Sequence, residues 1–428
     1  MSRTQTINNS QVEMNELSRS ARMAVLAAAF LGLAFDGIEL GLMPVASLSV
    51  TQSLLGDDYT SSLGGTWFAW FTAALMLGAA VGGSLLGNLG DRIGRSRAMG
   101  VSILFYSAFA GLGAFVQTCE QMLLLRFLVG LGVGGMWPNG VALVAECWPN
   151  ASRPTVSGVL GAGINVGILG LSQLVRVFPI TPDSWRWIFA LAAIPAVLGV
   201  FVLTLLPESP KWLTARGKVG ESNPSAAPPL FSMFRGELLR PTLIGIMLAA
   251  VPLIGAWAGS KWMIPWADRV GGLDHPGYKA TTQGWWALGA TLGSFMGAPI
   301  AAWIGRRLSY FLISLGATAL TVAMFQLTAP LESSFLPIVF AQGFVATLFF
   351  GWLPLYLPEL FPVEVRATGA GLSMNIGRFI TAAGVLGAGS LFVFFDSSYP
   401  AIGAACAMIY ALGMIVVFWA PNTAGKTL

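Results

Sequence analysis

The stretch AECWPNASRPTVSG (145–158) has a counterpart in PELFPVEVRATGAG (358–371), which lies 213 residues further along this chain of 428 residues. In both stretches a glutamate precedes an arginine by seven residues, and the two pairs are Glu146 with Arg153 and Glu359 with Arg366. A weaker repeat relates GDRIGRSR (90–97) to AAWIGRRL (301–308). Because the offset is about half the chain, the repeats predict two halves built on one plan.

The composition is that of a chain that lies mostly in lipid. Hydrophobic residues make up 55% of the sequence and charged residues only 10%, and the mean hydropathy is +0.72. Soluble proteins carry about 25% charged residues, so a soluble globular enzyme, a disordered chain and a nucleic-acid binder are excluded. The three cysteines and the single histidine lack metal-ligand spacing, and neither a G-x-S-x-G elbow nor a phosphate loop occurs. We therefore expect no enzyme, no metal and no cofactor.

Twelve segments are apolar over the length of about 20 residues that a helix needs to cross a bilayer. Lipid cannot satisfy bare backbone groups, so each segment is predicted to be a helix. The segments are roughly 22–50, 63–88, 98–118, 120–147, 154–179, 186–206, 241–268, 280–304, 309–329, 335–361, 366–394 and 399–420. The predicted fold is an all-α membrane protein with twelve transmembrane helices in two six-helix pseudo-symmetric halves.

The polar stretch 207–240 divides the chain and is predicted to be a flexible linker. The other predicted parts are a tail (1–21), a first six-helix half (22–206), a second half (241–420) and a short tail (421–428). With the N-terminus inside, 16 of the 23 Lys and Arg residues lie on the inner side and 3 on the outer side. We therefore expect both termini in the cytoplasm and the protein in the plasma membrane, the inner membrane of a bacterium. The polar first residues predict no cleavable signal peptide.

Several motifs resemble those of the major facilitator superfamily. GNLGDRIGRSR (87–97) resembles its loop G-x-L-x-D-R-x-G-R-R/K between helices two and three. RFLVGLGVGGMWPNGVALVAECWP (126–149) resembles helix four of aromatic acid/proton symporters and sugar porters, and FDGIEL (35–40) resembles the helix-one D-G-x-D of the aromatic acid group. PESPKWL (207–213) resembles a sugar-porter motif, and RATGAGLSMNIGR (366–378) resembles helix eleven of aromatic acid and organic anion transporters. The resemblance covers nearly the whole chain and implies transport by alternating access between two halves.

The loop after helix two is expected to act as a gate. We expect Asp91 at the N-terminus of helix three, where the helix dipole favours an anion, with the arginines of the loop paired to acids at helix ends. The second half keeps Arg306 but not the acid of this motif, so its gate is expected to be weaker. The expected gating residues are Asp91, Arg92, Arg95, Glu146, Arg153, Glu359 and Arg366. The alternative is that the cations only mark topology.

Arg378 is expected to bind the substrate. It lies ~18 Å along helix eleven from Arg366, near the middle of the membrane, where a charge costs about 2.5–3.5 kcal/mol. Asn165 holds the matching place in helix five, at the same offset of 213. An arginine offers a fork suited to a carboxylate, and the resembled organic anion transporters carry an arginine in helix eleven. The alternative is a structural arginine paired with an acid.

Helix one carries two acids, Asp36 and Glu39, which share one face. From the rise per residue, Glu39 and Arg126 of helix four reach similar depths, and we predict that they pair. Protonation of Glu39 would release Arg126 and couple a proton to substrate movement, and Asp36 is assigned to the same proton-coupling group. The resembled sugar porters that use protons have an Asp and an Arg at the matching positions. A permanent structural pair is the alternative.

Lys261 is a further substrate-binding candidate, in helix seven with Trp257 one turn before it. Gly259 and Pro265 are expected to interrupt the helix here, as is common at transporter sites. A cation beside indoles suits an anion with an apolar or aromatic body, and Trp137 is a candidate wall of the same pocket. Snorkelling of Lys261 to the outer surface is the alternative, as is an interfacial or packing role for the tryptophans.

The combined prediction is a secondary active transporter of a small organic anion, a carboxylate with or without an aromatic body. Four intramembrane cations against two buried acids favour the anion, and they are Arg126, Arg176, Lys261 and Arg378 against Asp36 and Glu39. The expected partners are the organic anion, protons and the lipid bilayer, with no nucleic acid, and the protein is expected to be a monomer. A sugar or polyol porter and a transport-inactive membrane receptor are the alternatives.

Overall fold

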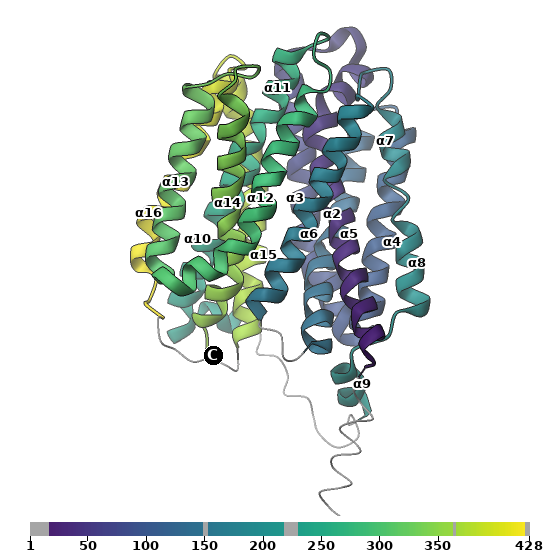
Figure 1. The fold of residues 1–428 in the computed structure, drawn as a ribbon, viewed down its shortest axis with the longest axis vertical. Coiled ribbons are helices and arrows are strands. Elements are labelled where there is room, and N and C mark those ends of the chain that lie inside the picture. The colour runs from purple at the N-terminus through teal and green to yellow at the C-terminus, as the bar shows by residue number, and fades with distance from the viewer. Residues whose placement is uncertain (1–16, 149–152, 218–229, 363–364, 424–428) are drawn as a thin grey trace, which may run out of the picture.

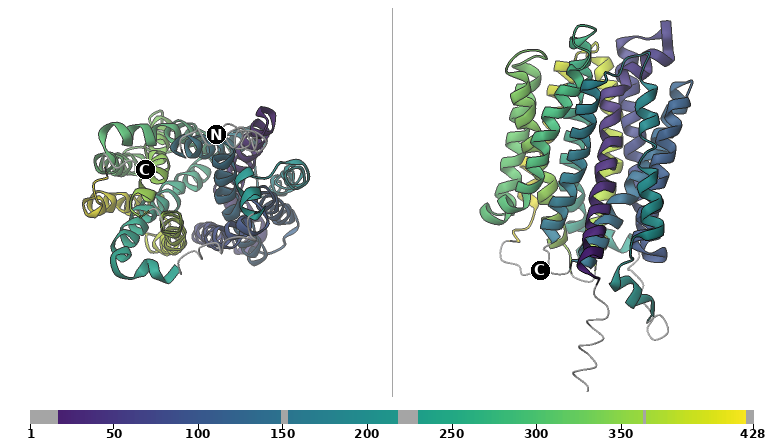
Figure 2. Two further views of the ribbon diagram at one scale, coloured as in Figure 1. Left: turned by 90° about the horizontal axis from the view of Figure 1, so that it is seen from below. Right: turned by 45° about the vertical axis from the view of Figure 1, so that its right-hand side comes forward.

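The computed structural model describes residues 17–148, 153–217, 230–362 and 365–423. This part of the chain contains 12 helical segments long and apolar enough to cross a membrane. They stand side by side in two groups, one from each half of the sequence (Figure 1; Figure 2, left). Each predicted span overlaps one of these segments, so the predicted fold class is confirmed.

The first group is formed by six spans. The sixth span is divided by a turn at residues 192–195. Pro195, the last residue of this turn, has no N–H to continue the helical hydrogen bonds. The helices are α2 (Arg19–Leu55), α3 (Ser61–Ile93), α4 (Arg95–Leu112), α5 (Cys119–Cys147), α6 (Arg153–Val177), α7 (Arg186–Leu191) and α8 (Ala196–Leu205), with the short turns η1 (Gly56–Asp58) and η2 (Gly113–Phe115).

The second group is also formed by six spans, and its first span changes winding along its length. A π-helical turn and a 3-10 turn separate the two α-helical parts of this span. The elements are α10 (Leu239–Ile254), η5 (Gly255–Gly259), η6 (Ser260–Trp262), α11 (Met263–Gly271), α12 (Tyr278–Ile304), α13 (Arg306–Gln326), α14 (Phe335–Glu359), α15 (Arg366–Phe394), α16 (Tyr399–Val416) and η7 (Val417–Trp419).

Several helices begin at a residue that caps their free N–H groups. The side chains of Thr60 and Thr118 accept hydrogen bonds from backbone N–H groups three residues later, at the starts of α3 and α5. Ser18 and Ser398 do the same at the starts of α2 and α16. Serine and threonine are preferred at this position because their oxygens satisfy orphan backbone donors.

The stretch expected to be a flexible linker has regular structure in its described parts. Its first part forms α9 (Pro210–Gly217), and its last part forms η3 (Leu230–Phe234) and η4 (Gly236–Leu238). Ser209 accepts a hydrogen bond from the N–H of Trp212, whose indole in turn donates to the carbonyl of Asp91 at 2.9 Å. This contact docks α9 on the end of α3, and the flexibility of the stretch stays a prediction. Residues 218–229, like 1–16 and 424–428 of the predicted tails, lie outside the described part of the chain.

The two halves use the same close helix packing. A Cβ on Gly78 of α3 would lie 2.1 Å from the carbonyl oxygen of Phe127 in α5, and a Cβ on Gly297 of α12 would lie 2.2 Å from that of Leu348 in α14. Only glycine permits such an approach, and small residues are typical of helix contacts in membranes. Between the halves, α3 packs along α15 and α6 packs along α12.

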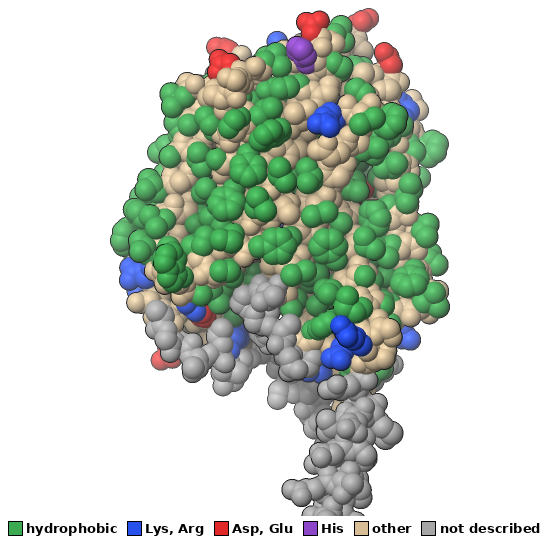
Figure 3. All heavy atoms as spheres, in the orientation of Figure 1, with side chains coloured by type: hydrophobic (Ala, Val, Ile, Leu, Met, Phe, Trp, Pro, Cys, Tyr) green, Lys and Arg blue, Asp and Glu red, His purple; other side chains and the backbone are tan. Residues whose placement is uncertain are grey.

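The surface is divided into bands. In Figure 3 hydrophobic side chains cover the middle of the visible face, and charged side chains gather toward its two ends. A band of this kind fits the hydrocarbon core of a bilayer, about 30 Å thick. The chain is therefore an integral membrane protein whose helices cross the bilayer.

Candidate functional site

Successive helices begin at opposite ends of the bundle. The helices α2 and α15 begin at the end near which the chain terminates, here called the terminal end (Figure 1). The helices α5 and α12 begin at the opposite end, here called the distal end.

Glu39 and Arg126 form the ion pair predicted from their depths. Nη1 of Arg126 donates to Oε2 of Glu39 at 3.1 Å, and Nη2 donates to the Glu39 carbonyl at 3.0 Å. Both side chains are 1% exposed. Arg126 lies about 10 Å from the distal start of α5, by the rise per residue. Oε1 of Glu39 has no hydrogen-bond partner among the described residues, so the carboxylate keeps a free lone pair inside the protein.

Asp36 lies one turn before Glu39 and interacts electrostatically with Arg378 of the other half. The carboxyl group of Asp36 is 2% exposed, and its Oδ1 lacks a hydrogen-bond partner within the described segments. Nη1 of Arg378 donates to Oδ1 of Asn375 at 3.4 Å, and Asn375 donates to Ser84 of α3 at 3.4 Å. The α3–α15 contact thus holds Arg378 at the interface between the two halves.

Asn165 lies at a different contact between the halves. Its Nδ2 donates to Oγ of Ser294 in α12 at 3.0 Å, and the side chain is 7% exposed. Arg378 belongs to the α3–α15 contact, and no hydrogen bond joins the two residues in the described chain. The pseudo-symmetry therefore holds for their positions in sequence, while their immediate partners differ. A role for Asn165 in binding substrate stays a prediction.

Lys261 is buried without an anion. It lies in η6, where the seventh span is wound as a 3-10 turn, and its side chain is 1% exposed. Its Nζ lies 3.4 Å from the ring centroid of Trp286 in α12 and 5.9 Å from that of Trp257. Nζ has no hydrogen-bond partner in residues 17–148, 153–217, 230–362 and 365–423. The snorkelling alternative is therefore wrong, because the unwound turn directs this side chain onto an indole face inside the protein.

The change of winding occurs where glycine was expected to interrupt the helix. The π-helical turn η5 ends at Gly259, and the 3-10 turn that carries Lys261 follows directly. Pro265 falls inside α11 and causes no break in it. Trp137, the other predicted wall, is half-buried in α5, where its ring lies 3.8 Å from the position of a Cβ on Gly161.

Hydrogen bonds join the two halves at the distal end. Nζ of Lys279, at the start of α12, donates to Oγ of Ser49 in α2 at 3.1 Å and to Oδ2 of Asp268 at 3.0 Å. The ring of Trp262 packs on Phe68 of α3 at 5.0 Å and stacks on Phe392 at 4.8 Å between centroids. The distal end is closed by these contacts.

The ion pairs at the terminal end lie within single halves. Arg95 contacts Asp91, and its Nε lies 3.6 Å from Oε1 of Glu146. In the second half, Arg306 donates to both carboxylate oxygens of Glu359, at 2.9 and 3.3 Å. Arg306 therefore makes a two-point contact with its carboxylate, and the expectation of a weaker second gate stays a prediction.

Asp91 was predicted at the N-terminus of the third membrane helix, which is α4 in the structure, and this placement is wrong. Asp91 belongs to the last turn of α3, which runs on to Ile93. The anion at the start of α4 is Glu208, whose carboxylate accepts the N–H of Ser96 at 3.1 and 3.2 Å. Glu208 belongs to the motif PESPKWL (207–213). A lone acid between two prolines was the feature of the sequence that could have indicated its role at the helix start.

The remaining predicted gating residues make fewer described contacts. Arg92 is exposed in the last turn of α3. Arg366 opens α15 half-buried, and its Nε lacks a hydrogen-bond partner among the described residues. The side chain of Arg153 lies outside the described part of the chain. Roles in gating stay predictions for the whole group.

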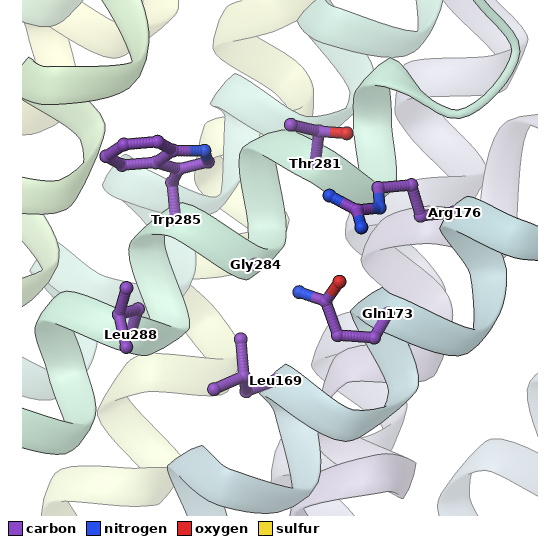
Figure 4. A pocket seen from close by; sticks show the side chains of 7 residues that line it. All are labelled: Leu169, Gln173, Arg176, Thr281, Gly284, Trp285 and Leu288. Atoms are coloured by element: carbon purple, nitrogen blue, oxygen red, sulfur yellow. The ribbon is translucent and has the colours of Figure 1, made fainter.

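A small groove opens where α6 meets α12. Its volume is about 80 Å³. Figure 4 shows Gln173 and Arg176 on α6 facing Thr281 and Trp285 on α12 across it. The lining is completed by Leu169, Gly284 and Leu288. The buried charges Asp36, Glu39 and Lys261 do not line it, and Arg176, counted above among the intramembrane cations, is exposed there.

Two six-helix halves that meet around buried, incompletely paired charges have the architecture of a secondary transporter. Comparison with known proteins agrees. Residues 24–230 match the family described as sugar (and other) transporter. The chain is 31% identical over 360 residues to a probable 4-methylmuconolactone transporter of Cupriavidus pinatubonensis, covering 83% of this chain and 81% of the relative. It is 29% identical to the cis,cis-muconate transport protein of Acinetobacter baylyi, covering 87% and 90%.

The fold is shared with solved structures. The xylose transporter XylE from E. coli, in a partially occluded inward-open conformation, superposes with a TM-score of 0.71 at 18% identity, covering 96% of this chain and 100% of that one. The chain belongs to the major facilitator superfamily of transporters, as its motifs indicated.

Proposed function

We propose that this protein is a proton-coupled carrier of a small organic anion and that Lys261 holds the anionic group. The observation that carries the proposal is the burial of Lys261 without any anion in the described chain. An unpaired buried charge is costly. A carboxylate on Nζ would supply the missing counter-ion, and the faces of Trp286 and Trp257 would hold the body of the substrate.

The relatives support an unsaturated or aromatic carboxylate as the substrate class. Their names assign them 4-methylmuconolactone and cis,cis-muconate, and a further relative, 26% identical to this chain, is named a gentisate transporter. All three compounds carry a carboxylate. An unsaturated or aromatic carboxylate has a flat apolar body beside its charge. Such a shape matches a cation flanked by indole rings, with Arg378 as a second cation further from the distal end.

Proton coupling is assigned to Glu39, with Arg126 as its counter-ion. When Glu39 takes up a proton, Arg126 loses its charged partner and is free to turn toward another anion. Asp36, one turn away on α2, is a second buried carboxyl group. A carboxylate that can be neutralised beside two arginines is a suitable element for linking proton and substrate occupancy.

The conformation supports alternating access from the terminal end. Contacts between the halves close the distal end, whereas the ion pairs at the terminal end stay within one half. We place the terminal end, with both termini and the segment 207–240, in the cytoplasm of a bacterium. The working unit is a monomer of two six-helix halves, 22–206 and 241–420.

Uptake into proteoliposomes tests the proposal. The panel is labelled cis,cis-muconate, gentisate and nicotinate, with labelled xylose as the sugar arm, each with and without an inward proton gradient. We expect uptake of at least one acid, stimulated by the gradient and abolished by Lys261→Met. Lys211→Met, which alters an exposed lysine of α9, is the matched control and should keep full uptake.

Two results would overturn parts of this assignment. Uptake of the acid by Lys261→Met at the parent rate would remove the anion site from Lys261. Uptake of xylose with no uptake of any acid would make the chain a sugar porter.

A further inference from the structure

A single buried amide joins four segments of the second half. Gln342 of α14 is 0% exposed. Its Oε1 accepts the indole N–H of Trp286 in α12 at 2.8 Å. Its Nε2 donates to Oγ of Ser260 in η6 at 2.5 Å and to Oγ1 of Thr321 in α13 at 3.3 Å. The seventh span, α12, α13 and α14 therefore all meet at this one side chain.

The chemistry of the partners fixes the orientation of this amide. The indole nitrogen only donates, so the oxygen of Gln342 must face Trp286. The amide nitrogen then faces Ser260 and Thr321, whose hydroxyls can accept. Ser260 also donates to the carbonyl of Gly255 at 3.3 Å, across the π-helical turn. Among neutral side chains, only an amide offers an acceptor and two donors in this fork.

The two ends of the amide hold the two sides of the Lys261 contact. Trp286 provides the ring on which Nζ of Lys261 lies, 3.4 Å from the centroid. Ser260 directly precedes Lys261 in the 3-10 turn. Loss of the amide would remove the hydrogen bond that orients the Trp286 ring, and it would leave the Ser260 hydroxyl with only Gly255 and Tyr410 as partners. Gln342 thus acts on Lys261 through Trp286 and Ser260.

We infer that Gln342 is the positioning residue of the anion site: it sets the Lys261–Trp286 contact and with it the affinity for the substrate. The inference rests on the proposed function of Lys261. The ordinary role for such a residue is to join helices, and that role predicts lost stability without a selective change in affinity. A positioning role predicts a higher KM while the maximal rate is kept.

The test uses two variants that each remove one side of the same hydrogen bond. Gln342→Leu removes the amide, and Trp286→Phe keeps an aromatic ring but removes the N–H. In proteoliposomes with the transported acid of the panel above, each is expected to raise KM about tenfold and to change the maximal rate by less than about twofold. The double variant is expected to be no worse than the poorer single variant. Gln326→Leu, at the exposed end of α13, is the matched control and keeps the parent KM.

A second pairing checks that the effect passes through Lys261. In a Lys261→Met background, in which uptake is abolished, the acid is expected to give no stabilisation against thermal unfolding with or without Gln342→Leu, whereas Gln342→Leu alone is expected to keep a stabilisation that needs about tenfold more acid. Additive increases in KM for Gln342→Leu and Trp286→Phe, or a parent KM for Gln342→Leu, would overturn the inference.

Failure of the proposed function is separable from failure of this inference. If none of the three acids is carried, the proposed function fails by itself. The same cycle is then measured on the unfolding temperatures of the ligand-free protein in detergent. Strong coupling between Gln342→Leu and Trp286→Phe would keep the amide as the support of Trp286, and additive shifts would overturn it.

Discussion

The two halves bury cations in opposite ways. In the first half, Arg126 has a carboxylate at 3.1 Å and a carbonyl at 3.0 Å. In the second half, Lys261 has an indole ring and, among the described residues, no hydrogen-bond partner. Both side chains are 1% exposed, so burial alone does not distinguish them. Under the proposed function, the difference separates a charge that the protein neutralises itself from one that the substrate would neutralise.

Removal of Arg126 is the strongest way to break this comparison. Arg126→Met leaves Glu39 buried without its counter-ion, and we expect the free energy of unfolding to fall by about 3–5 kcal/mol. The measurement is thermal and denaturant unfolding in detergent. The double variant Arg126→Met with Glu39→Gln removes both charges and is expected to recover most of the loss. A double variant no more stable than the single one would mean that the pair is not the source of the effect.

Removal of Lys261 is expected to have the opposite sign. Lys261→Met replaces an unpaired buried ammonium by an apolar side chain of similar length, so the free energy of unfolding should rise, by about 1 kcal/mol. Uptake of the acid should be lost at the same time. The same unfolding assay measures the first effect, with Lys211→Met as the control. A clear loss of stability would contradict the view that Lys261 is unpaired in the empty protein.

Glu39→Gln sharpens the functional side of the comparison. The amide keeps the size of the side chain but cannot exchange a proton in the working pH range. We expect uphill uptake driven by a proton gradient to disappear, while exchange of labelled for unlabelled acid continues. Both are measured in proteoliposomes with the panel acid. Gradient-driven accumulation by this variant would show that the coupled proton binds elsewhere.

The sequence predicted the fold because lipid leaves few choices. Long apolar segments must be helices in a bilayer, and the repeat of Glu146 and Arg153 in Glu359 and Arg366 defined the halves. The Glu39–Arg126 pair was also predictable, because the rise per residue places both groups at one depth. Depth along a straight helix is the one coordinate that sequence supplies directly.

The rest of the site depends on the direction in which each side chain leaves its helix and on where each helix ends. The depth of a residue along its helix gives neither. The direction of Lys261 follows from a π-helical and a 3-10 turn, and each shifts the facing of later residues by tens of degrees relative to an α-helix. Gln342 appeared as one polar residue in an apolar helix, and its partners come from three separate spans. Asp91 was misplaced because α3 continues to Ile93, and a boundary error of one turn changes the sign of the dipole.

The smallest expected effect concerns the distal end. There Lys279 donates to Asp268 of its own half and to Ser49 of the first half. Lys279→Met removes this bridge, and a lost hydrogen bond of about 1 kcal/mol changes the ratio of open to closed molecules about fivefold. Ala69→Cys provides a reporter, because Ala69 is 0% exposed and its side chain would lie 2.7 Å from a Cβ on Gly389 of the second half. A membrane-impermeant thiol reagent added to the distal side should therefore label this cysteine about fivefold faster in the Lys279→Met background. Lys211→Met in the same reporter background should leave the rate unchanged. Equal rates in all three proteins would mean that the aromatic contacts of Trp262 close the distal end without help from the lysine, since those contacts also cross between the halves and carry no charge.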